Sequence, residues 1–450
     1  MEREESLFKI TWPIFVESVL FMLLGSIDIF MLGKFSDNAV ASVGIVNQII
    51  SMFNLIFGVI TTGTMIICAQ YIGANNRKED IIRLTGVSLM VNTVIGILVS
   101  LIMVVFDDLL LKMMNVAPEL TGLSSDYIKI VGGFLFVQAI SMTFTSIIRS
   151  HGFTKVCMYV TLGMNIFNVL FNYSLIFGNF VFPQLGVRGA AISTVISKLL
   201  GTIILGYYMF KVVVKDFSLK YFAKFPIEQF KKIISLGIPS AGEQISYNAA
   251  KLVGTVILTY ISIEAITANS YVNNIIMFIY IFSVAIGQGT AILVGRLVGK
   301  GDNEGAYKLC MSSFKKALVV SISMAILIGI LGRSILSFFT NNEEVISLGA
   351  AVLFVVLFLE PGRVFNIVII NSLRAAGDVK FPVYIGICSM WTIAVGLAYI
   401  LSIPLGLGLV GMWIALALDE WVRGVIMYFR WKSKKWEHKS ILVDKEEVVS

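Results

Sequence analysis

The stretch "ITWPIFVESVLFMLLGSIDIFML" (Ile10–Leu32) decides the fold because it is an almost unbroken apolar run. About 20 apolar residues in a helix are enough to cross the hydrocarbon core of a bilayer. The run is too long for the h-region of a cleaved signal peptide, so we expect it to stay as a first transmembrane helix. Its two carboxylates, Glu17 and Asp28, therefore need partners or a water-filled cavity.

Runs of this kind recur along the whole chain. Of the 450 residues, 57% are hydrophobic and 14% are charged, whereas a soluble domain carries about 25% charged residues. We therefore predict an all-α polytopic membrane protein with 12 transmembrane helices. The predicted spans lie near residues 10–32, 44–70, 82–106, 126–148, 156–178, 189–212, 234–259, 268–295, 314–338, 348–373, 381–402 and 408–430.

The distribution of lysine and arginine predicts the orientation of these spans. The connections on one side carry only Lys34, Lys112, Arg188 and Arg333, and most of the remaining basic residues lie on the side of the N-terminus. Cytoplasmic connections are enriched in basic residues. We therefore expect both termini to be cytoplasmic.

An internal repeat relates the two halves of the chain. Shifting the sequence by 226 residues aligns residues 12–78 with residues 238–304 without a gap. The matched identities include Pro13/Pro239, Glu17/Glu243, Leu32/Leu258, Asn47/Asn273, Gly63/Gly289, Thr64/Thr290 and Gly73/Gly299. Six helices followed by six similar helices predict two bundles related by a pseudo-twofold axis along the membrane normal, which is typical of transporters.

The repeat defines the expected domain organisation. We expect an N-terminal six-helix lobe over 1–211, a cytoplasmic linker over 212–232, a C-terminal six-helix lobe over 233–431 and a charged cytoplasmic tail over 432–450. The basic and aromatic linker suits either a segment lying on an anionic membrane surface or a solvated connection.

Polar residues inside the spans are candidates for a site, because each is expensive to insert. Glu17 and Asp28 are 11 residues apart and lie on one helix face, about 16 Å apart along the axis. A second polar stripe follows the seventh span. Its candidates are Glu243, Tyr247, Asn248 and Lys251, and those of the other spans are Asn47, Gln48, Asn165, Asn168, Asn172, Asn273, Glu360 and Arg363.

These polar residues leave two interpretations open. They line a wet cavity, or they serve as hydrogen bonds between helices. Glu360 with Arg363, and Asp419 with Arg423, have the spacing of ion pairs within one helix. Lys198 either extends towards the interface or pairs with an acid.

The residues that a metalloprotein, an enzyme or a channel would need do not occur in a suitable pattern in this sequence. The four cysteines are scattered singly, and there are two histidines, so we expect no metal site of the zinc type, no disulfide framework and no organic cofactor. We expect no enzymatic activity, because no cluster of catalytic residue types gathers near a membrane face, and no channel filter motif is present. The sequence also indicates no nucleic-acid partner.

Several motifs together resemble the multidrug and toxic compound extrusion (MATE) family of transporters over nearly the whole chain. They are "WP" at residues 12–13 followed by Asp28 and "GK" at residues 33–34, "GTMIICAQYIGANN" (63–76), "NVLFNYSLIFG" (168–178), "GVRGAAIST" (186–194), "GTAILVGRLVGKGD" (289–302) and "LRAAGD" (373–378). Each motif alone is weak, but their order along the chain is that of the family.

The resemblance implies a function and a coupling site. It implies export of cationic, amphipathic or drug-like compounds in exchange for H⁺ or Na⁺ by a monomer in the bacterial cytoplasmic (inner) membrane. Asp28 matches the family's aspartate of the first helix, and Asn168 and Asn172 match nearby positions of the fifth. A buried carboxylate is a suitable group to take up a proton or Na⁺ and to release a competing cation.

This chain departs from the family pattern at three positions. Some members have an aspartate at the position of Asn172 and a glutamate at that of Tyr247, and an aspartate where Arg363 stands. A cation site of that type in the C-terminal half, or one built from two carboxylates at Asp28, therefore does not follow from the resemblance. The alternative function is a flippase for lipid-linked oligosaccharides or lipid precursors of the same superfamily, which requires a larger and more cationic cavity.

Overall fold

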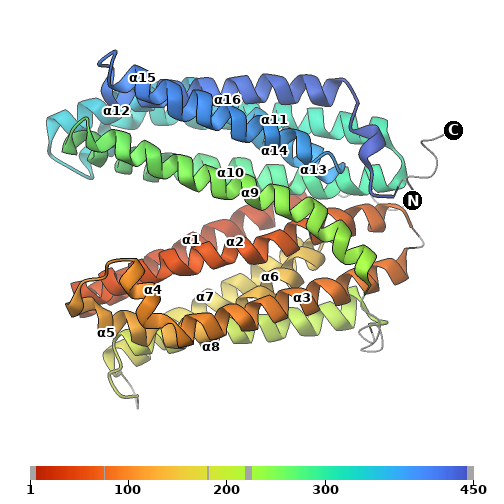
Figure 1. The fold of residues 1–450 in the computed structure, drawn as a ribbon, viewed down its shortest axis with the longest axis horizontal. Coiled ribbons are helices and arrows are strands. Elements are labelled where there is room, and N and C mark those ends of the chain that lie inside the picture. Colours follow the sequence, from red (N-terminus) through yellow and green to blue (C-terminus); the bar gives the residue numbers. More distant parts are fainter. Residues whose placement is uncertain (1–6, 76, 180–181, 218–225, 443–450) are drawn as a thin grey trace. The chain divides into compact units, whose positions relative to one another are not determined.

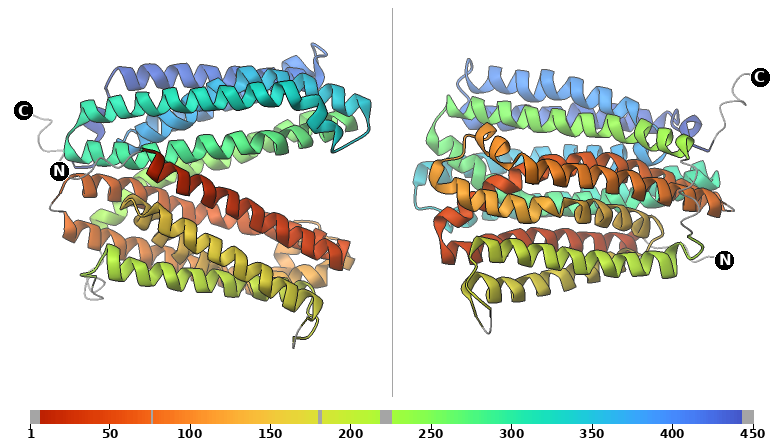
Figure 2. Two further views of the ribbon diagram at one scale, coloured as in Figure 1. Left: turned by 180° about the vertical axis from the view of Figure 1, so that it is seen from behind. Right: turned by 60° about the horizontal axis from the view of Figure 1, so that its bottom comes forward.

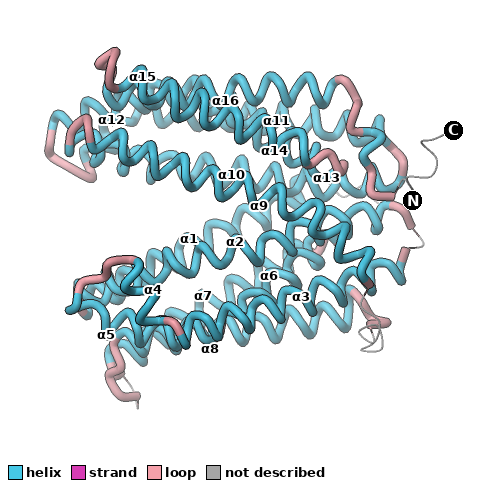
Figure 3. The backbone as a smooth tube through the Cα atoms, viewed as in Figure 1, coloured by secondary structure: helices cyan, strands magenta, loops and turns pink. Residues whose placement is uncertain are grey.

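The computed structural model describes residues 7–75, 77–179, 182–217 and 226–442. Within these ranges the secondary structure is helical, and no strand occurs (Figure 3). The chain divides into two compact units. The first holds Trp12–Cys68 and Asn76–Gly237, and the second holds Ala69–Asn75 and Ile238–Ser450 together with Ser6–Thr11.

The first unit contains the helices of the N-terminal half (Figure 1). They are α1 (Leu7–Phe35), α2 (Asp37–Gly73), α3 (Lys78–Val105), α4 (Asp107–Met113), α5 (Pro118–Tyr127), α6 (Leu135–Ser150), α7 (Thr154–Phe177) and α8 (Val187–Tyr208), with π-helical turns η1 (Ile128–Gly132) and η2 (Met209–Val213). Helix α7 packs along α8, and α3 packs along α6 (Figure 2).

Close approach of α7 and α8 depends on Gly189. A Cβ added there would lie 2.5 Å from the backbone oxygen of Leu175. Small residues allow helix backbones to come this close. The first unit's core is a cluster of apolar side chains that includes Leu32, Val99 and Ile176.

The second unit contains the helices of the C-terminal half. They are α9 (Ile227–Thr259), α10 (Ile263–Lys300), α11 (Asn303–Ser337), α12 (Glu343–Val364), η4 (Phe365–Ile370), α13 (Asn371–Ala375), α14 (Lys380–Ser389), η5 (Met390–Leu397), α15 (Ala398–Ser402), α16 (Gly408–Lys432) and η6 (Glu437–Lys439). The division between the units falls within α1, α2 and α9. The core of this unit includes a large apolar cluster around Trp413 and another around Trp431.

Helix α3 shows a surface suited to lipid. Its exposed side chains include Val94, Ile97, Leu98 and Leu101, while its buried face mixes apolar residues with polar Asn92 and small residues. An exposed face made of large apolar residues is expected where the surroundings are hydrocarbon rather than water.

Helices cover all twelve predicted spans. Nine helices of the described chain are long and apolar enough to cross a membrane, or ten if the bent pair Pro118–Gly132 and Leu135–Ser150 is one span. Helices α9 and α16 are also long, with 33 and 25 residues, but carry charged residues inside. The predicted all-helical, two-bundle fold class is therefore confirmed.

Some details differ from the sequence prediction. The predicted connection before the fourth span contains two short helices, α4 and α5, and the predicted tenth and eleventh spans contain the π-helical segments η4 and η5. Segment η4 follows directly on α12, which contains Pro361. Part of the predicted linker, 218–225, and the end of the tail, 443–450, lie outside the described residues.

Candidate functional site

Asp28 forms a polar centre with two asparagines in the first unit. The side-chain amide of Asn172 donates hydrogen bonds to Asp28 Oδ1 at 2.5 Å and to Asn168 Oδ1 at 2.9 Å. Both asparagines are fully buried. They are four residues apart on α7, so their side chains lie on one helix face. The three residues predicted as the cation-coupling group are therefore brought together.

Two residues of α8 contact Asn168 of this centre. Ser193 Oγ donates to the backbone oxygen of Asn168 at 2.9 Å, and Asn168 Nδ2 lies 3.5 Å from Thr194 Oγ1. Thr194 thus lies beside Asn168 on the neighbouring helix. Sequence reasoning missed Thr194. Thr194 lies in the motif "GVRGAAIST", which could have pointed to it.

One acceptor atom of this centre is free. Oδ1 of Asn172 is buried and has no hydrogen-bond partner among the described residues. Burying an acceptor without a partner costs free energy, so a donor or cation that reaches this atom is favoured. Together with the Asp28 carboxylate it offers the oxygen ligands that a hard cation or a proton prefers. In the described part of the chain, no three His, Cys, Asp or Glu side chains gather as a metal cluster.

Lys198 adds a positive charge to the same region. It lies one helical turn after Thr194 on α8, and its charge interacts with that of Asp28. Among the described residues no ion pair within 4.0 Å is formed by Lys198. The centre thus contains one carboxylate and one ammonium group, rather than two carboxylates.

Glu17 lies in a different environment from Asp28. Its side chain is 1% exposed and forms an ion pair with Arg149 at 2.8 Å. Thr161 Oγ1 lies 3.5 Å from the second carboxylate oxygen. The structure therefore places this candidate in a buried ion pair between α1 and α6, not on the wall of a cavity.

Glu243 is the counterpart of Glu17 in the second unit. Its carboxylate forms an ion pair with Arg374. The two glutamates are matched by the repeat, and the two arginines begin the similar segments "RSHGFTK" and "RAAGDVK". The same acid–base pair therefore occurs once in each half of the chain.

The remaining asparagine and glutamine candidates are spread over several helices. Asn165 donates to the backbone oxygen of Leu20 at 3.0 Å, which ties α7 to α1. Asn47, Gln48 and Asn248 are exposed in the described structure, and they do not join the centre at Asp28.

A cavity in the second unit brings together four further candidates. It has a volume of about 140 Å³. Tyr247 and Lys251 line it from α9, Asn273 from α10, and Arg363 from α12. Glu360 does not line the cavity; it is fully buried behind Arg363, with which it forms an ion pair.

Charged side chains along this cavity alternate in sign. Arg363 joins Glu360 to Glu420, whose Oε1 lies 3.9 Å from Arg363 Nε. Arg423 then joins Glu420 at 3.3 Å to Asp419 at 2.7 Å. The predicted i, i+3 and i, i+4 pairs are therefore confirmed, and Glu420 connects them. Sequence reasoning missed Glu420, although its spacing of three residues from Arg423 was visible.

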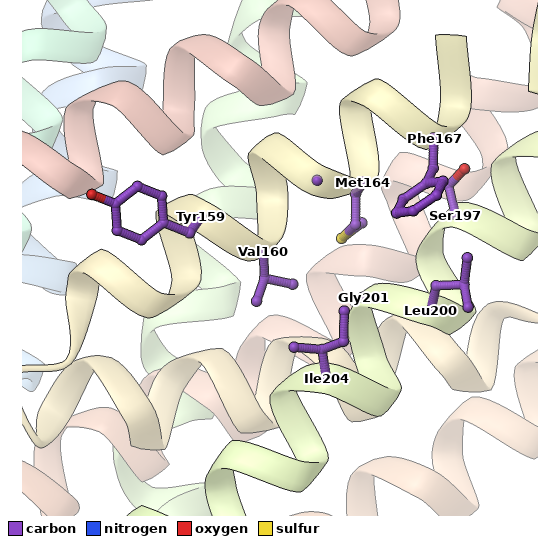
Figure 4. Close-up of a pocket in the computed structure, with 9 residues that line it drawn as sticks. Tyr159, Val160, Met164, Phe167, Ser197, Leu200, Gly201 and Ile204 are labelled. Carbon is purple, nitrogen blue, oxygen red and sulfur yellow. The ribbon is translucent and has the colours of Figure 1, made fainter. Parts of the chain in front are cut away.

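A separate recess in the first unit is almost wholly apolar. It has a volume of about 230 Å³ and lies between α7 and α8. Tyr159, Val160, Met164 and Phe167 line it from one helix, and residues including Ile204 line it from the other (Figure 4). Because few polar groups line it, this recess offers a ligand no specific hydrogen bonds, and we assign it no function.

Comparison with known proteins yields consistent matches along the chain. The MatE family model matches residues 13–174 and again residues 239–400, an offset of 226 residues that confirms the predicted repeat. The chain is 42% identical over 440 residues to the uncharacterized transporter YisQ of Bacillus subtilis, covering 98% of this chain and 96% of that protein. It is 27% identical to the probable multidrug resistance protein NorM of Thermotoga maritima, covering 98% and 95%.

Solved structures share the fold at low sequence identity. An outward-facing MATE family transporter of the MOP superfamily matches with a TM-score of 0.87 at 18% identity, covering 95% of this chain and 96% of that chain. The Vibrio cholerae transporter VcmN in its bent form matches with a TM-score of 0.88 at 16% identity, again covering 95% and 96%.

Proposed function

This chain belongs to the multidrug and toxic compound extrusion family of membrane transporters, and on that premise we propose that it is a secondary antiporter. It exports small organic cations or amphipathic drugs in exchange for H⁺ or Na⁺. The probable multidrug resistance proteins among its relatives support this class of substrate. It acts as a monomer in the bacterial cytoplasmic membrane with both termini in the cytoplasm, as the distribution of basic residues indicates.

The observation that carries the proposal is the contact between Asp28 and Asn172. A carboxylate that receives one short hydrogen bond from a buried amide still has acceptor capacity for a proton or Na⁺. Oδ1 of Asn172, on the same amide group that contacts Asp28, is available as a second oxygen ligand. An incoming ion neutralises the Asp28 carboxylate between α1 and α7. The ion and a cationic substrate therefore compete for the negative charge of this carboxylate.

Coupling follows from this competition. When the ion neutralises Asp28, an organic cation loses its electrostatic attraction to the first unit. When the ion leaves, the attraction returns. Alternating access of the two six-helix lobes then converts an inward ion gradient into outward movement of the cation, because each ligand favours a different state.

The test is ethidium efflux from proteoliposomes under an imposed pH or Na⁺ gradient. Asp28→Asn keeps the shape of the side chain but removes its charge, so we expect its efflux to fall to that of protein-free liposomes. Asp108→Asn changes an exposed aspartate of the same unit and serves as the matched control, with efflux unchanged.

Two results would contradict the proposal. Unchanged gradient-driven efflux in Asp28→Asn excludes the role of this carboxylate. Absence of efflux from the unsubstituted protein under both gradients excludes the substrate class and favours the flippase alternative.

A further inference from the structure

The cavity of the second unit combines an apolar wall with a charged wall. Leu359, Met390, Ala394 and Met412 supply apolar surface, and Trp413 adds an aromatic ring. An engineered cavity of about 150 Å³ is large enough to bind benzene. The volume of about 140 Å³ therefore suits a single aromatic ring.

The charged wall has three bases and two acids. The bases are Lys251, Arg363 and Arg423, and the acids are Asp419 and Glu420. Both arginines are held in ion pairs with carboxylates. Lys251 lines the cavity, but none of the ion pairs or side-chain hydrogen bonds of the described residues involves its ammonium group.

The acids of this wall have their hydrogen-bond partners. Asp419 accepts from Ser389 at 2.5 Å and pairs with Arg423. Glu420 Oε2 accepts from Asn366 at 2.6 Å and lies 3.3 Å from Arg423. An organic cation entering the cavity would therefore have to displace existing donors.

The bases, in contrast, have donors to spare. Nε of Arg423 is buried without a hydrogen-bond partner among the described residues, and Arg423 as a whole is 8% exposed. A buried donor without a partner is expensive, and an incoming acceptor relieves that cost. Lys251 supplies a full positive charge and up to three donors at the same cavity.

We infer that this cavity binds the carboxylate group of a small aromatic acid. The ring lies against Trp413 and Met412, and the carboxylate accepts hydrogen bonds from Lys251 and from Arg423. The site is separate from the centre at Asp28, because every residue that lines it belongs to the second unit.

The experiment compares three probes of one shape and different charge. Fluorine NMR of 4-fluorobenzoate, 4-fluorobenzamide and 4-fluorobenzylammonium reports binding to the purified protein in detergent through line broadening. We expect the benzoate to bind and the other two probes neither to bind nor to displace it. Protein-free micelles measure partition into detergent.

Substitutions locate the site. Lys251→Gln removes the charge of an exposed side chain, and we expect benzoate binding to weaken by about tenfold or more, as for a lost hydrogen bond to a charged group. Lys251→Arg keeps the charge and should keep binding. Lys315→Gln, an exposed lysine of α11 in the same unit, is the matched control, and Ala394→Met should block binding by filling the cavity.

The outcomes separate this inference from the proposed antiport. Binding is measured without any gradient and should persist in Asp28→Asn, whether or not that variant transports. Tighter binding of the benzylammonium probe, or benzoate binding that Lys251→Gln leaves unchanged, would overturn the inference. Stronger displacement of benzoate by inorganic pyrophosphate than by unlabelled benzoate would also overturn it, because the ligand would then be a phosphate group.

Discussion

Arg149 at the end of α6 holds the buried carboxylate of Glu17 at 2.8 Å, and Arg374 holds Glu243 in the same way in the other half of the chain. The repeat thus preserves an ion pair in each half. Its glutamate lies on the first helix of that half, and its arginine is the first residue of "RSHG" or "RAAG". Conversely, the repeat does not preserve Asp28, whose counterpart is Gly254. The two halves share a structural pair and differ at the candidate coupling residue.

Removing one partner of the Glu17–Arg149 pair should destabilise the protein strongly. Glu17→Gln leaves the guanidinium group of Arg149, whose side chain is 17% exposed, without its counter-charge. Breaking a buried pair in this way costs about 3–5 kcal/mol. We expect a lower Tm in detergent for Glu17→Gln, and a double-mutant cycle with Arg149→Met should recover part of the loss. Strictly additive effects would show that the two residues do not interact.

Asn172 should matter for transport more than for folding. Asn172→Leu has a similar size but removes both hydrogen bonds, to Asp28 and to Asn168. A hydrogen bond to a charged group contributes about 1.5–3 kcal/mol, so we expect ethidium efflux to fall by about tenfold or more. Asn179→Leu is the control, because Asn179 lies just after the end of α7 and is more exposed than Asn172. Equal losses in both variants would argue against a specific role for Asn172.

Gly189 should tolerate no larger residue. Gly189→Ala places a Cβ 2.5 Å from the backbone oxygen of Leu175, which forces α7 and α8 apart. Overpacking of this kind costs about 1–3 kcal/mol. Gly163→Ala lies on the same pair of helices, with no atom within 4 Å of the added Cβ, and should be neutral or stabilising. Thermal unfolding of both variants in detergent measures the difference, and equal Tm values would contradict the close contact.

Trp436 should anchor the chain beyond α16 to the second unit. Its ring is 0% exposed and stacks on Trp431 with centroids 4.2 Å apart. Its indole N–H also donates to the backbone oxygen of Trp431 at 2.9 Å. Trp436→Ala should cost about 3–5 kcal/mol, whereas Lys435→Ala, at an exposed neighbouring position, should cost little. A Trp436→Ala variant with unchanged Tm would show that this stacking does not stabilise the unit.

The residues that follow α16 make tertiary contacts that their composition does not predict. From the sequence alone, residues 432–450 are a charged tail that we expect to be cytoplasmic. Gln70 nevertheless accepts hydrogen bonds from Ser440 and Ile441 at 3.1 and 3.0 Å, and Trp436 is buried. The two hydrogen bonds to Gln70 join residues 370 and 371 positions apart, which no local pattern reports.

The sequence by itself determined the helical membrane fold and the repeat. Long apolar runs form helices in lipid, because only a helix satisfies its backbone hydrogen bonds within a single segment. The offset of 226 residues followed from matched prolines, glutamates and glycines, and the family model repeats at the same offset. The neighbourhood of Asp28, Asn168 and Asn172 was predicted from the resemblance and from the four-residue spacing on one helix.

Only the tertiary structure decided which polar residues pair and which remain free. Glu17 and Asp28 share one helix face in the sequence, yet Glu17 meets Arg149 and Asp28 meets Asn172. Glu360 and Arg363 were equal candidates for a cavity, yet only Arg363 lines one. Spacing along a helix determines a side chain's direction, but its partner comes from another helix, and packing between helices sets which partner that is.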